Sequence, residues 1–250
     1  MASATGIPEN YNSNDAAPRE GLGEDEPLLG RRGDASQEDG QPIYKNLWIG
    51  TAPVAQAGIW ILTAIIWGAI FSHPLIFFSP HPLLNTTALL LLTQSTLLLQ
   101  PTHTRPQKRL GTLLHALLNT LSTLLLLAGL LIIEINKISH SGTHFVSPHA
   151  ILGLAFYILI ALQVVVGVTQ YWVPSVYGGE ERARGVWKYH RVGGYVTLGV
   201  GVGTVVAASW TDYNVNVLGV RHWGVILAGV LVVLGVGARV RLAKLGWKRG

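Results

Sequence analysis

The chain has 250 residues, of which 49% are hydrophobic and only 12% are charged. About a quarter of the residues are charged in an ordinary soluble domain, so this ratio favours a protein embedded in a lipid bilayer. The sequence contains no cysteine, which excludes disulfides, thiolate-bound metals, iron–sulfur clusters and the covalently attached haem of c-type cytochromes.

The net charge of +5 combines two unlike parts of the chain. Residues 1–40 carry nine acidic residues and three arginines, whereas residues 41–250 carry fifteen Lys and Arg and four acidic residues. Because the basic excess belongs to the apolar part, we expect it to face lipid headgroups and we expect no nucleic-acid partner.

The first segment, residues 1–42, has the composition of a disordered acidic tail, rich in Gly, Pro, Ser, Asp and Glu. Within it, the run from Glu24 to Leu29 resembles the acidic dileucine signal that adaptors of vesicle transport read on the cytosolic side. This run indicates a vacuolar or endolysosomal membrane, against the alternative that the tail is acidic without a sorting role.

Six apolar segments follow the tail, at about residues 53–71, 82–100, 113–133, 150–171, 192–210 and 223–238. Their lengths predict spanning helices, because lipid forces each segment to satisfy its own backbone hydrogen bonds. We therefore expect an all-α integral membrane domain of six helices over residues 43–240, followed by a basic tail over 241–250. The last segment is the shortest, and Arg239 is expected to snorkel from its end.

The positive charges of the connections give the expected orientation. One side of the bundle carries most of the Lys and Arg residues of the loops, and the other side carries only Lys137 and Arg221. The positive-inside rule therefore places both termini and the loops after the second and fourth segments in the cytosol.

Four histidines stand at or just outside the start of an apolar segment: His81, His115, His149 and His190. Their spacings of 34, 34 and 41 residues each correspond to about one membrane crossing and one short loop. A chain that reverses at each crossing places His81 and His149 on the luminal or outer side, and His115 and His190 on the cytosolic side.

The spans contain no Asp or Glu, so these histidines need another partner if they are buried. Two histidines on one side can approach one iron from opposite faces and supply both axial ligands of a haem, which would carry electrons and activate no substrate. Zinc would need three or four ligands at one point. The alternatives are a histidine-relay transporter of protons or metal ions, and a non-catalytic sorting protein with ordinary interfacial histidines.

Basic residues beside the cytosolic pair could bind haem propionates or attract an anionic electron donor, or could act only as topology signals toward anionic lipid. The residues in question are Arg109, Lys188 and Arg191.

Further histidines gather on the luminal side and could hold a metal ion that is to be reduced, or could be ordinary interfacial residues. They are His73, His140, His144 and His222.

Glycines of the fourth and fifth segments could leave room for a flat macrocycle or allow close packing of helices. Gly199 and Gly203 have the small-xxx-small spacing that is typical of close helix packing.

Local context around the four histidines resembles the cytochrome b561 family, in its short six-helix branch. The residues that carry the resemblance are His81-Pro82, His115, His149 preceded by His144-Phe145-Val146, and Tyr189-His190 followed by Gly194-Tyr195. The resemblance covers about residues 45 to 240. It implies a four-helix core, made of the second to fifth helices, that binds two b-type haems with bis-histidine ligation. In this core His81 is paired with His149 and His115 with His190.

The resemblance also implies electron transfer from cytosolic ascorbate, or a similar donor, to monodehydroascorbate or a ferric chelate, as in a transmembrane ascorbate-dependent oxidoreductase or ferric reductase. The chain departs from the ascorbate-using members at two places. It has LLLLTQSTLLLQ between His81 and His115 where they have a valine-tyrosine-arginine motif, and SPHAIL around His149 where they have leucine-histidine-serine-tryptophan. A homodimer is left open.

Overall fold

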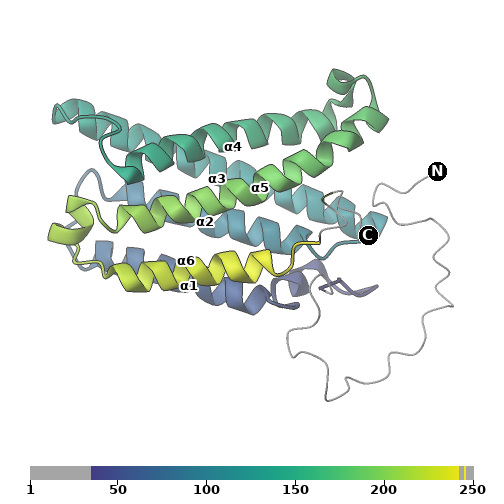
Figure 1. The fold of residues 1–250 in the computed structure, drawn as a ribbon, viewed down its shortest axis with the longest axis horizontal. Coiled ribbons are helices and arrows are strands. Elements are labelled where there is room, and N and C mark those ends of the chain that lie inside the picture. Colours follow the sequence, from purple (N-terminus) through teal and green to yellow (C-terminus); the bar gives the residue numbers. More distant parts are fainter. Residues whose placement is uncertain (1–34, 242–244, 246–250) are drawn as a thin grey trace, which may run out of the picture.

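The computed structural model describes residues 35–241 and residue 245. Its long helices run back and forth along one axis (Figure 1): α1 Ala52–Phe71, α2 Pro80–Leu99, α3 Arg105–Ser139, α4 Pro148–Trp172, α5 Glu180–Ala208 and α6 His222–Gly237. Short turns of helix accompany them: η2 Ile43–Leu47, η3 Pro174–Tyr177 and η4 Tyr213–Val217. All regular structure in the described ranges is helical, which confirms the expected fold class.

Five of the helices are long and apolar enough to cross a bilayer, and α6 is a shorter apolar helix of 16 residues. Their outward surfaces are covered with exposed leucine, isoleucine and valine side chains, notably along α3 and α4. A face of this kind is favourable only against lipid or another apolar surface. The bundle therefore has the surface of a membrane domain.

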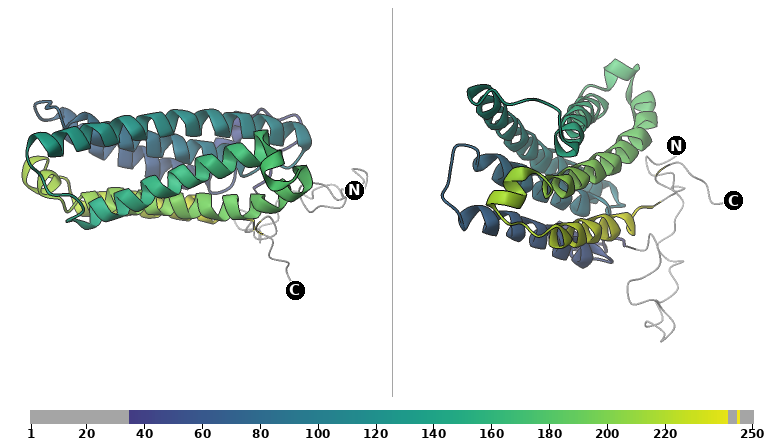
Figure 2. Two further views of the ribbon diagram at one scale, coloured as in Figure 1. Left: turned by 90° about the horizontal axis from the view of Figure 1, so that it is seen from above. Right: turned by 60° about the vertical axis from the view of Figure 1, so that its left-hand side comes forward.

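The helices form two facing layers, with α1, α2 and α3 in one and α6, α5 and α4 in the other (Figures 1 and 2). At the α1–α6 edge the backbones touch, because a Cβ atom on Gly58 would lie only 2.6 Å from the carbonyl oxygen of Ala228. Gly235 meets the backbone of Ala55 in the same way. Small residues thus allow α6 to pack closely along α1.

Two of the four histidines lie in the first turn of their helices, as the sequence predicts. Proline is the first residue of both α2 and α4, where its missing N–H group costs no hydrogen bond, and His81 and His149 come second. The Ser147 hydroxyl also accepts a hydrogen bond from the backbone N–H of Ala150, at 3.2 Å.

The other two histidines lie deep in their helices, which corrects the expected helix starts. Helices α3 and α5 begin at Arg105 and Glu180, well before the apolar segments, so that His115 and His190 are each the eleventh residue. Thr104 and Gln107 form a capping box at the start of α3. Apolar length measures only the part of a helix that crosses the bilayer, and polar turns extend these two helices beyond it.

The connections α2–α3 and α4–α5, the helix η2 and the end of α6 all lie at one end of the bundle, called here the basic end (Figure 1). It carries Lys108, Arg191, Arg239 and Arg241. His81 and His149 lie at the opposite end, where α2 and α4 begin. Both ends of the described chain 35–241 lie at the basic end.

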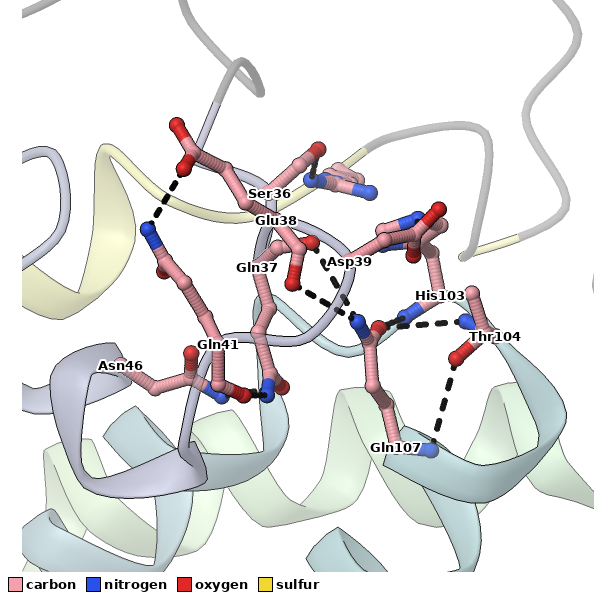
Figure 3. A network of polar contacts seen from close by, with 10 residues as sticks. Ser36, Gln37, Glu38, Asp39, Gln41, Asn46, His103, Thr104 and Gln107 are labelled. Atoms are coloured by element: carbon pink, nitrogen blue, oxygen red, sulfur yellow. Dashed lines mark hydrogen bonds and ion pairs between the residues drawn. The ribbon is translucent and has the colours of Figure 1, made fainter. Parts of the chain in front are cut away.

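Residues 35–42, which composition assigns to the tail, pack across the basic end as an N-terminal strap (Figure 3). The Gln37 side chain is 2% exposed and receives a 3.0 Å hydrogen bond from the Asn46 amide. Gln107 donates to the carbonyl of Glu38 at 3.2 Å, and Arg241 donates to the hydroxyl of Ser36. The polar residues that give this segment the composition of a tail are also the ones that bind it to the basic end of the bundle. The dileucine run lies outside the described residues.

Candidate functional site

His81 of α2 and His149 of α4 face each other at the end opposite the basic end. Their ring centres are 6.3 Å apart and their planes are nearly perpendicular, at 89°. Nδ1 of His81 lies 2.9 Å from the carbonyl oxygen of Gly129, and Nδ1 of His149 lies 3.0 Å from that of Thr204. A carbonyl only accepts, so each Nδ1 carries the hydrogen and each neutral ring keeps its Nε2 lone pair for a metal.

His115 of α3 and His190 of α5 form a second pair near the basic end. Their ring centres are 6.4 Å apart and their planes cross at 84°. Nδ1 of His190 is buried and has no hydrogen-bond partner among the described residues, and the buried His115 ring lies near the backbone of Ser95. A Cβ atom on Gly167 would lie 3.1 Å from Cε1 of His190, so this glycine makes room for the imidazole.

Both separations match two imidazoles bound to one metal ion from opposite sides. A metal–nitrogen distance of about 2 Å places the centres of two opposed imidazole rings roughly 6 Å apart. Each pair thus fits the axial positions of a haem iron, for which histidine is a common ligand. Residues 35–241 bring no three His, Cys, Asp or Glu side chains together at one point.

An asparagine follows each of the first two histidines by one helical turn, which the reading of the sequence missed. Nδ2 of Asn85 donates to the carbonyl of His81 at 2.7 Å, and Nδ2 of Asn119 donates to that of His115 at 2.6 Å. The signal was present in the sequence as the runs HPLLN and HALLN, 34 residues apart.

The three basic residues singled out in the sequence occupy different environments. Arg109 and Lys188 are exposed, and the Lys188 ammonium lies 4.9 Å from the ring centre of Tyr189. Arg191 is partly buried, and Lys108 lies close enough to Arg191 and Arg241 for their charges to repel. The structure therefore groups Arg191 with Lys108 and Arg241, a connection that the sequence does not reveal.

Arg239 does not snorkel as expected, because its side chain is folded back against η2 and α2. Its side chain is 3% exposed, and Nη2 donates to the carbonyls of Asn46 at 3.0 Å and Leu97 at 3.3 Å. Burial lowers the pKa of Arg239 to about 10. The charge serves to hold η2 and the last turn of α2 together.

The expected luminal histidines do not converge in the part of the chain that the structure describes. His73 and His140 each lie close to a carbonyl in the last turn of the helix that precedes them. Nε2 of His144 lies 2.9 Å from the carboxylate of Glu134, while His222 stacks on a tryptophan ring. These are the contacts of ordinary interfacial histidines, and the metal cluster stays a hypothesis.

Glycines of α4 and α5 also divide into two groups. Gly201 packs against an aromatic ring of α4, so a side chain there would clash within the bundle. A Cβ atom on Gly199 or Gly203 would meet no atom of the described chain within 4 Å. The small-xxx-small spacing of these two residues therefore does not mediate helix packing inside the described chain.

The comparison with known families agrees with this geometry. The sequence model for eukaryotic cytochrome b561 matches residues 80–213, more than half of the chain, and this range contains all four paired histidines. A search of curated proteins gave no match. The chain belongs to the eukaryotic cytochrome b561 family.

Proposed function

We propose that the protein carries electrons across a membrane through two b-type haems, each held by one histidine pair. The donor is a cytosolic reductant such as ascorbate, and the acceptor is monodehydroascorbate or a ferric chelate on the other side. Family membership supplies the general part: a multi-pass integral membrane protein that binds haem and takes part in transmembrane electron transfer. The finer proposal rests on one observation, the grouping of four histidines into pairs 6.3 and 6.4 Å apart.

In the proposed arrangement His81 and His149 hold one haem, and His115 and His190 hold the other. Bound haem supplies one-electron redox chemistry. With two imidazoles as its protein ligands, each iron would have no coordination position left for oxygen or a substrate. The carbonyls of Gly129 and Thr204 fix the first pair with Nε2 free to bind, as partners beyond the ligand shell commonly do.

The two pairs lie far enough apart to serve the two faces of a bilayer. Asn119, one turn after His115, contacts Ser95 of α2 at 3.0 Å, and Ser95 is fourteen residues beyond His81. At a rise of 1.5 Å per residue, the pairs are about 20 Å apart along the bundle. This distance covers most of a hydrocarbon core of about 30 Å.

The basic end is proposed to face the cytosol and to receive the donor. Lys108, Arg191 and Arg241 form a group of like charges near His115 and His190, and an ascorbate monoanion would relieve their mutual repulsion. The excess of Lys and Arg in the connections at this end supports the cytosolic orientation of both termini. The vacuolar or endolysosomal address rests on the run Glu24 to Leu29 alone.

Reconstituted vesicles test the direction and the chemistry together. Protein that contains haem is inserted into liposomes with ferricyanide trapped inside, and ascorbate is added outside. We expect haem to be reduced first and the trapped ferricyanide afterwards, with no such reduction in vesicles that carry His115→Ala protein. Protein with two haems that never reduces the trapped acceptor would contradict transmembrane transfer. A colourless protein that moves protons would favour the histidine-relay transporter.

A further inference from the structure

Helices α2 and α3 contain the same local device at opposite ends of the bundle. His81 and Asn85 on α2 correspond to His115 and Asn119 on α3, with an offset of 34 residues. In each case the asparagine amide donates to the backbone carbonyl of its histidine, at 2.7 and 2.6 Å. Asparagine is a weak helix former, so two such residues at the same place within spanning helices need a reason.

The offset of 34 residues also relates the residues that contact these histidines and asparagines from the neighbouring helix. Gly129 of α3 accepts from His81, and the residue 34 positions earlier is Ser95 of α2, whose hydroxyl contacts Nδ2 of Asn119 at 3.0 Å. The α2–α3 hairpin is therefore an inverted repeat, in which each helix completes the surroundings of the histidine on the other helix.

The repeat is broken at the His81 end by Tyr157 of α4. Its hydroxyl reaches across to α2 and α3, with Oδ1 of Asn85 at 3.0 Å and the carbonyl oxygen of Leu126 at 2.9 Å. The position that corresponds to Tyr157 on α5, by the 41-residue spacing of His149 and His190, is Leu198, which has no hydroxyl. Within the described residues, Asn85 thus has a hydrogen-bond partner in the other layer, whereas Asn119 donates to residues of α2 and α3.

We propose that Asn85 and Asn119 are positioning residues, each for the haem bound by its own histidine, and that Tyr157 makes the two haems unequal through Asn85. This inference rests on the proposed ligation by the four histidines. Nδ2 of Asn85 lies 3.4 Å from Nδ1 of His81, so the positive end of the amide dipole faces the ligand. The positive end of the Asn85 amide dipole beside His81 disfavours the extra positive charge of oxidised haem. It therefore raises the reduction potential of the haem that His81 binds.

Three variants of the full-length, haem-loaded protein test the proposal: Asn85→Ala, Asn119→Ala and Tyr157→Phe. The readouts are the electron paramagnetic resonance signals of the two oxidised haems and a redox titration that resolves them. Each signal is assigned first by its loss in His81→Ala or His115→Ala. We expect Asn85→Ala to lower the potential of the His81 haem, raising its ratio of oxidised to reduced form up to tenfold, or about 59 mV.

Tyr157→Phe should shift the same haem in the same direction by less, and Asn119→Ala should shift only the His115 haem. Tyr177→Phe is the matched control, because its hydroxyl contacts Thr169 near the other end of α4 and should leave both signals unchanged. If Asn85→Ala does not fold, the test uses Tyr157→Phe, which removes only one oxygen atom.

Reduction potentials of the two haems that shift equally in every variant, or in none, would overturn the inference and leave the proposed function standing. Wild-type protein without haem would instead overturn the proposed function.

Discussion

His115 and His190 face each other with ring centres 6.4 Å apart, although they lie 75 positions apart in the chain. Nδ1 of His190 is buried without a partner within the described chain, which is costly in a dry environment. In the proposed arrangement Nε2 of both rings would bind one haem iron, and this coordination would hold the rings in place. The proposed haem site near the basic end depends on this relationship, which motivates the first prediction.

Gly167 is predicted to be essential for the haem at the basic end. A Cβ atom there would lie 3.1 Å from Cε1 of His190, so Gly167→Val should displace the imidazole and weaken haem binding tenfold or more. The measurement is the haem-to-protein ratio after purification, which should fall from about two toward one. Gly153→Ala is the control, because its Cβ atom would be 3.8 Å from Thr204, an ordinary contact. Loss of both haems in Gly167→Val would show general misfolding.

Helix α1 offers a pair of glycines with opposite expected effects on stability. Gly58→Ala places a methyl group 2.6 Å from the carbonyl oxygen of Ala228 and should destabilise the fold by about 1–3 kcal/mol. Gly68→Ala meets nothing within 4 Å in the described chain and should be neutral or stabilising by up to about 1 kcal/mol, because alanine favours helix. Thermal unfolding in detergent compares the two. Equal melting temperatures would contradict the close α1–α6 contact.

Asn46 is predicted to anchor the N-terminal strap. It is fully buried and donates to Oε1 of Gln37 at 3.0 Å and to the carbonyl of Leu98 at 2.8 Å. Asn46→Ala should cost about 1–3 kcal/mol, since both acceptors lose their donor. Hydrogen exchange of residues 35–47 should become faster, while exchange in α4 stays unchanged. Unaltered exchange in the strap would show that Asn46 does not hold it.

Charge at the basic end is predicted to control the rate of reduction by ascorbate. Lys108→Gln and Arg241→Gln should slow stopped-flow reduction several-fold at low salt, and the difference should shrink at high salt because exposed charges are screened. Arg109→Ala and Lys188→Ala remove exposed charges outside this group and serve as comparisons. Equal slowing in all four variants would assign the effect to overall charge, and unchanged rates would leave these residues as topology signals.

Much of the fold could be predicted from the sequence, because lipid imposes simple rules. Segment length and the alternation of sides predicted the helices and placed His81 with His149 and His115 with His190. The starts of α3 and α5 were missed, since polar turns outside the bilayer carry no apolar signal. The snorkelling of Arg239 was wrong because its acceptors, carbonyls of residues 46 and 97, are far away in the sequence.

Other features of the site follow only from three-dimensional contacts. Nothing in the local sequence indicates that Tyr157 reaches Asn85, or that Lys108 lies near Arg241. The repeat of histidine and asparagine is the exception, because the runs HPLLN and HALLN are visible in the sequence and have a physical meaning once the hairpin is known.

The central claim, that each histidine pair holds one haem, is tested most directly by counting haems and recording reduced spectra in four single variants. Wild-type protein reduced with dithionite should show low-spin α-bands and about two haems per chain. His81→Ala and His149→Ala should each lose one haem and leave identical spectra, and His115→Ala and His190→Ala should each lose the other. Loss of one common haem in all four variants, or a wild-type protein without colour, would contradict the claim.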